Sequence, residues 1–102
     1  MSRLESVKCN FYDFHSVKSV LELFKIEYNT SLHDSYYDED TICEFYIIGN
    51  MTETKVKNLA DWFYGLITQD NISMIWFEYM NNDNEYKTET ITSCFPPDLS
   101  NF

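Results

Sequence analysis

The stretch of residues 72–94, "ISMIWFEYMNNDNEYKTETITSC", decides the fold class, because it holds the clearest β-hairpin pattern in the chain. Two runs that are rich in β-branched and aromatic residues, 72–80 and 85–94, flank the tetrapeptide "NNDN". Asn and Asp favour tight turns, since their side chains bond to the nearby backbone and tolerate a left-handed conformation. Alternate residues of the second run are polar, as in a solvated or edge strand. We therefore expect two antiparallel strands here.

Towards the N-terminus, apolar spacing predicts two more strands and two helices. Strands are expected over 6–12, where apolar and polar residues alternate, and over 41–48, "TICEFYII", which is β-branched and aromatic. Helices are expected over 16–28 and 52–68, whose apolar residues fall on one face. These residues are Val17, Val20, Leu21, Phe24 and Tyr28 in the first helix, and Val56, Leu59, Ala60, Phe63, Leu66 and Ile67 in the second.

The element order β-α-β-α-β-β predicts a single α+β domain over residues 1–102. The expected architecture is a four-stranded, mostly antiparallel sheet with both helices packed on one face. The adjacent Pro96 and Pro97 are expected to end the last ordered element, which would leave 98–102 as a flexible tail.

The charge of the chain restricts its partners. There are 17 acidic residues against 7 basic ones, and the formal net charge is −10. Between Lys25 and Lys55 the chain has seven acidic residues and no Lys or Arg. Such a field repels nucleic acid and anionic membranes and accelerates encounter with basic surfaces. We therefore expect a basic protein partner and no direct contact with nucleic acid or membrane.

Compartment and oligomeric state are inferred from what the sequence lacks. No apolar run approaches the roughly 20 residues that span a bilayer, and the N-terminus lacks the apolar core of a signal peptide. Cys9, Cys43 and Cys94 are widely spaced in strand-like surroundings, which predicts buried, reduced thiols. A cytoplasmic protein is expected, and a monomer is favoured.

Catalytic and metal-binding patterns are not found. With Gly49 and Gly65 as its only glycines, the chain cannot form a glycine-rich phosphate loop or a nucleophile elbow. A calcium loop that starts at Asp34 or Asp38 lacks the central Gly and the final Glu. His33 and the acids after it could collect a transition metal, but no paired His or Cys spacing supports this. We expect no catalytic residue, no metal site and no cofactor.

The candidate binding site is the stretch 33–45, "HDSYYDEDTICEF", which holds five carboxylates and two adjacent tyrosines but no Lys or Arg. Much of it lies in the long connection after the first helix, and connections of that length are usually functional or disordered. Tyrosine rings beside carboxylates suit a partner rich in Arg and Lys. The alternative is that one ring closes the core and the acids are only solvated. The expected partner-binding residues are Asp34, Tyr36, Tyr37, Asp38, Glu39, Asp40 and Glu44, with Asp83 and Glu85 at the hairpin tip.

In its segments "DSYYDED", "DWFY" and "NNDNEY", this acidic chain of 102 residues resembles the immunity proteins of bacterial contact-dependent inhibition and related toxin systems. The resemblance implies an antitoxin that binds and neutralises a cognate toxin, often a nuclease, by covering its basic active-site cleft. The alternative is a phage anti-defence protein, such as a DNA mimic or an anti-CRISPR-type inhibitor, which would rely on the same electrostatics.

Overall fold

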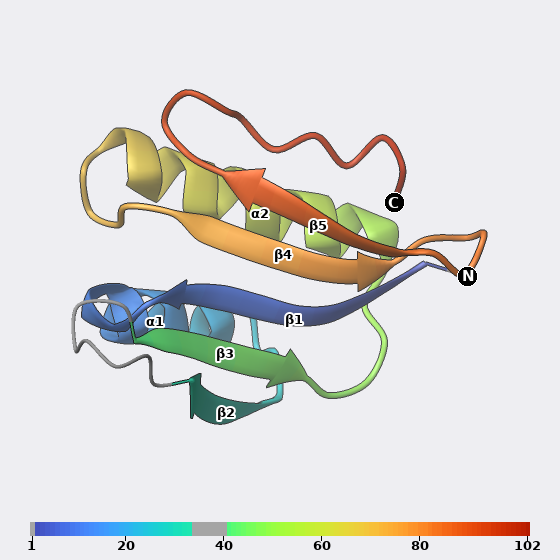
Figure 1. Cartoon of the computed structure of the whole chain (residues 1–102), viewed down its shortest axis with the longest axis horizontal. Helices are drawn as coiled ribbons and strands as arrows, with labels where there is room; N and C mark the ends of the chain where they lie inside the picture. The colour runs from blue at the N-terminus through green and yellow to red at the C-terminus, as the bar shows by residue number, and fades with distance from the viewer. Residues whose placement is uncertain (1, 34–40) are drawn as a thin grey trace.

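The computed structural model describes residues 2–33 and 41–102. Within them the chain forms an α+β domain with two α-helices and one five-stranded sheet (Figure 1). The elements are β1 (Arg3–Asn10), a 3₁₀ turn η1 (Phe11–Asp13), α1 (Phe14–Leu23), β2 (Tyr28–His33), β3 (Ile42–Ile47), α2 (Glu53–Thr68), β4 (Ile75–Met80) and β5 (Tyr86–Ile91). The strand order is β2-β3-β1-β4-β5, and every neighbouring pair is antiparallel.

Both helices lie behind one face of the sheet in Figure 1, and the hydrophobic core fills the space between the two layers. Because side chains alternate across a strand, Val7, Phe45 and Phe77 all point to the helix side and are fully buried. Helix α2 contributes Val56, Leu59 and Phe63 to the same core. The ring centroid of Phe63 lies 5.9 Å from that of Phe77.

The hairpin prediction is confirmed, because β4 and β5 pair antiparallel from Ile75↔Ile91 to Met80↔Tyr86. The turn is organised by Asn81, whose Oδ1 accepts hydrogen bonds from the backbone N–H groups of Asp83 and Glu85, both at 2.9 Å. Asn84 adopts a positive φ of 60°, which Asn tolerates better than most residues. The turn that the sequence "NNDN" predicts therefore forms between β4 and β5.

The prediction of four strands is wrong, because a fifth strand, β2, forms in the segment that was expected to be the connection after the first helix, and that helix ends earlier than expected. Helix α1 ends at Leu23, and Lys25 adopts a left-handed φ of 56°. The N–H of Ile26 donates to the carbonyl of Leu21 at 2.9 Å, and the N–H of Lys25 donates to the carbonyl of Glu22 at 3.0 Å. This pair of bonds closes the helix as a Schellman motif and lets the chain reverse into β2.

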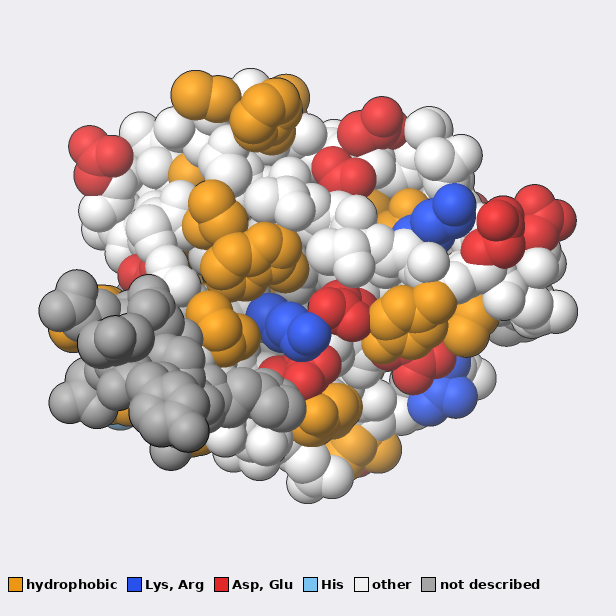
Figure 2. All heavy atoms as spheres, in the orientation of Figure 1, with side chains coloured by type: hydrophobic (Ala, Val, Ile, Leu, Met, Phe, Trp, Pro, Cys, Tyr) orange, Lys and Arg blue, Asp and Glu red, His pale blue; other side chains and the backbone are white. Residues whose placement is uncertain are grey.

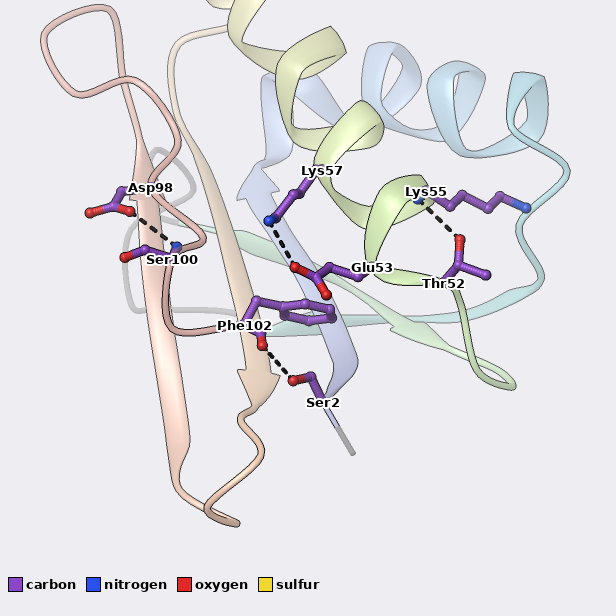
Figure 3. A network of polar contacts seen from close by, with 8 residues as sticks. All are labelled: Ser2, Thr52, Glu53, Lys55, Lys57, Asp98, Ser100 and Phe102. Carbon is purple, nitrogen blue, oxygen red and sulfur yellow. Dashed lines mark hydrogen bonds and ion pairs between the residues drawn. The ribbon is translucent and has the colours of Figure 1, made fainter.

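The expected tail at 98–102 also differs from the structure, in which this segment packs against the domain. Leu99 and Phe102 are buried, and the ring centroid of Phe102 lies 5.3 Å from that of Tyr79. The Ser2 hydroxyl donates to the Phe102 carbonyl at 2.6 Å, which joins this segment to the start of β1 (Figure 3). Apolar burial beyond Pro97 outweighs the interruption that the two prolines cause.

The cysteines divide into two groups. Cys9 and Cys43 are buried partners on β1 and β3, and burial raises the pKa of both thiols. Cys94 is exposed, so its predicted burial is wrong. Cys94 is exposed because β5 already ends at Ile91. The N–H of Thr92 then donates a hydrogen bond to the carbonyl of Phe95 at 3.1 Å, and the turn that this bond closes carries Cys94 out of the sheet.

Candidate functional site

The face of the sheet opposite the helices carries a cluster of polar and aromatic side chains, which we call the open face. Strand register places them together: Lys8 pairs with Glu44 on one side and with Trp76 on the other, while Ser6 pairs with Tyr46 and Glu78. Figure 2 is viewed onto this face and shows a basic side chain between acidic ones, with apolar side chains around them. The residues of the open face are Ser6, Lys8, Ile42, Glu44, Tyr46, Trp76, Glu78 and Tyr86.

An ionic group lies at the centre of the open face. Lys8 Nζ is 2.7 Å from Glu78 Oε1 and 3.8 Å from Glu44 Oε2. The hydrogen bond to Glu78, reinforced by the charge of Glu44, raises the pKa of Lys8 although partial burial opposes this. The Glu44 and Glu78 side chains are only 8% and 16% exposed. Two poorly solvated carboxylates therefore contact the same ammonium group.

Neutral donors hold both carboxylates in place from the sides. The Ser6 hydroxyl donates to Glu44 Oε2 at 2.7 Å, and the Tyr46 hydroxyl is also hydrogen-bonded to Glu44. The bond to Glu44 raises the pKa of Tyr46. Tyr86 bonds to Glu78 in the same way on the other side. Because several partners fix each carboxylate, the open face is ordered before any partner arrives, which lowers the entropic cost of binding.

Aromatic rings and a hollow surround the ionic group. Tyr46 and Tyr86 are 42% and 56% exposed. An open hollow of about 340 Å³ is lined by Lys8, Ile42, Trp76 and Glu78. Rings of this kind present rigid apolar area beside a carboxylate, and a guanidinium group can stack on such a ring while it pairs with the acid.

The titration of Tyr86 tests this geometry. Partial burial, with the charge of Glu78 and the hydrogen bond to it, raises the pKa of Tyr86 to about 12. Because the pKa of Tyr86 is higher in the folded state than in the unfolded state, folding favours the neutral phenol. This contribution to stability is fully present below the unfolded-state pKa of about 10 and is lost as the pH rises towards 12. We expect the difference between the ultraviolet titrations of wild type and Tyr86→Phe to show one phenol that ionises near pH 12. A difference curve centred near pH 10 would contradict the contact with Glu78.

The predicted binding residues fall into three groups. Asp34, Tyr36, Tyr37, Asp38, Glu39 and Asp40 lie outside the residues that the structure describes. Glu44 lies on the open face, where it is buried rather than exposed. Asp83 and Glu85 are exposed in the turn after β4, so the structure does not bring them into the open-face cluster.

Sequence reasoning missed most of the open face. Its members include Lys8, Trp76 and Glu78, none of which the sequence singled out as binding residues. A usable pattern was present, because Lys8, Glu44 and Glu78 each stand between two core residues of an apolar strand. A charged residue in such a position must lie on the opposite face of the sheet.

Residues 2–33 and 41–102 contain no group of three His, Cys, Asp or Glu side chains that could hold a metal ion. No helix in this part of the chain has the length and apolar character needed to cross a membrane. Comparisons of the chain with protein-family models, with curated proteins and with solved structures find no match.

Proposed function

We propose that this protein is an inhibitor of the immunity-protein kind, which binds a basic protein partner and neutralises it in the cytoplasm of the producing cell. The favoured partner is a toxin nuclease domain, whose cationic cleft the inhibitor covers. The observation that carries the proposal is the open face, where the poorly solvated carboxylates of Glu44 and Glu78 lie beside Lys8 and exposed aromatic rings adjoin them.

The physical argument joins long-range charge with short-range anchoring. A net charge of −10 draws a cationic surface towards the protein and raises the rate of association. At contact, arginine side chains of the partner can stack on Trp76 or Tyr46 and share the carboxylate of Glu78 with Lys8. Binding energy at interfaces is concentrated in a few such aromatic and charged residues.

The acidic stretch 34–40 remains part of the proposal as a second contribution. It connects β2, which ends at His33, with β3, which starts at Ile42 and carries Glu44 onto the open face. Four of the 17 acidic residues lie in this stretch, together with Tyr36 and Tyr37. We expect these acids mainly to increase the association rate, because the long-range attraction between opposite charges acts on encounter more than on dissociation.

Co-expression tests the proposal. A candidate toxin domain, chosen from the genes next to that of this protein, is expressed in a sensitive host with and without this protein, and growth is measured. We expect the protein to restore growth. We also expect the purified pair to associate at least about tenfold more slowly when the salt concentration rises from about 50 to about 500 mM, because the Debye length then falls below about 5 Å and screens the attraction.

Three outcomes would contradict the proposal in different ways. Growth that is not restored, with no complex detected, excludes a neutralising role against that toxin. Association rates that do not change with salt exclude electrostatic recognition. A phage operon as genetic context, together with binding to a restriction enzyme or a CRISPR effector, would support the anti-defence function instead.

A further inference from the structure

We propose that the outer edge of β2, which pairs with no other strand among the described residues, accepts an extended, basic segment of the partner as a sixth antiparallel strand of the sheet. The inference rests on the proposed function, because the partner is the same basic protein. It adds a second contact surface, made of main-chain groups, next to the open face.

The backbone geometry of β2 identifies the groups that are available. The N–H of Ile48 donates to the carbonyl of Glu27 at 3.0 Å, so these two residues form a hydrogen-bonded pair just before β2. Residues of an antiparallel strand direct their N–H and C=O groups alternately to either side. Asn29 and Ser31 therefore bond to β3, while Thr30 and Leu32 direct their groups outward. No described residue bonds to these outward groups, and the Thr30 and Leu32 side chains are exposed.

The two edges of the sheet differ in how they are protected. The edge strand β5 carries Lys87 and Glu89, and the N–H of Asp98 donates to Glu89 Oε1 at 3.1 Å, which brings the C-terminal segment alongside. The β2 sequence, "YNTSLH", contains no Asp, Glu, Lys, Arg or Pro. Charged residues and proline on edge strands prevent pairing with other chains. An edge without them is suited to strand addition, in which main-chain bonds supply affinity.

Charge decides between a basic partner and a second copy of this chain. A second copy would bring together two molecules that each carry a net charge of −10, which opposes association. Two acidic groups near the start of β2 are available to a cationic segment. Glu27 is exposed, and the Glu22 carboxylate accepts a hydrogen bond from the Tyr28 hydroxyl at 3.2 Å. Asn29 and Ser31 pair with Tyr46 and Glu44, so one side of an added strand would continue the open face.

Amide hydrogen exchange, measured residue by residue by NMR, tests the inference on the free protein and on its complex with the toxin domain. We expect exchange at Thr30 and Leu32 to slow by about 100-fold or more in the complex. Asn29 and Ser31 are internal controls, because their N–H groups are already bonded to β3 in the free protein. We also expect Thr30→Pro, which removes one outward donor and spares the β3 bonds, to weaken binding by about tenfold relative to Thr30→Ala.

The outcomes separate this inference from the proposed function. A complex that forms without slower exchange at Thr30 and Leu32 overturns strand addition and leaves the proposed function in place, even if Thr30→Pro fails to fold. Failure of both binding and growth rescue overturns both. The free protein at high concentration is the third case. If exchange at Thr30 and Leu32 slows there and sedimentation gives the mass of a dimer, the edge binds a second copy of this chain, and the proposal of a basic partner at this edge is wrong.

Discussion

Phe45→Ala is expected to lower the free energy of unfolding by about 3–5 kcal/mol, the usual range for truncating a fully buried phenylalanine. Phe45 has no exposed surface. Its ring centroid lies 5.3 Å from that of Phe14 in a stacked arrangement and 5.2 Å from that of Tyr28 in an edge-on arrangement. The ring thus joins α1, β2 and β3, and the cavity left by alanine would loosen all three elements.

The neighbouring residue provides the matched control for this measurement. Tyr46 follows Phe45 on β3 but points to the open face and is 42% exposed. We expect Tyr46→Ala to change the free energy of unfolding by about 1 kcal/mol or less, because exposed side chains contribute little to stability. Urea denaturation of both variants gives the comparison. Equal losses would contradict the assignment of the two faces of β3.

Trp76→Ala is expected to weaken binding of the basic partner by at least about 30-fold, which corresponds to about 2 kcal/mol. Trp76 lines the hollow of the open face together with Lys8 and Glu78. Its ring therefore offers a rigid apolar surface beside the ionic group. Calorimetry with the purified toxin domain measures the affinity, and circular dichroism verifies that the variant remains folded.

The other tryptophan of the chain is the control. Trp62 lies on α2, is 49% exposed, and has its ring centroid 5.8 Å from that of Phe24, so it belongs to the helix side of the molecule. We expect Trp62→Ala to leave the affinity within about twofold of wild type, because it is remote from the proposed interface. A large loss with Trp62→Ala and none with Trp76→Ala would transfer the interface to the helices.

Local patterns predicted those elements whose determinants are close together in the sequence. Helix α2 forms as expected, and Thr52 caps it by accepting a hydrogen bond from the Lys55 N–H at 3.2 Å (Figure 3). The β4–β5 hairpin forms because Asn81 supplies its turn bonds within five residues of chain. In both cases the stabilising contacts are local, so residue type and spacing are sufficient to predict them.

The end of α1 and the existence of β2 depended on contacts that local patterns do not encode. Tyr28 continues the apolar spacing of the first helix, so periodicity extended the predicted helix too far. Pairing with β3 and packing of the Tyr28 ring on Phe45 favour the strand instead. The reversal needs a left-handed conformation at Lys25, a residue type that gives no sequence indication of it.

The sequence by itself determined the fold class, the hairpin, helix α2 and the strongly acidic character of the chain, because composition and local spacing carry that information. Only the tertiary structure decided which charged residues meet. Lys8, Glu44 and Glu78 are distant in the sequence, and they come together because β1 lies between β3 and β4 in the sheet. Strand order is set by long-range packing of the core, so the open face could not be assembled from the sequence pattern alone.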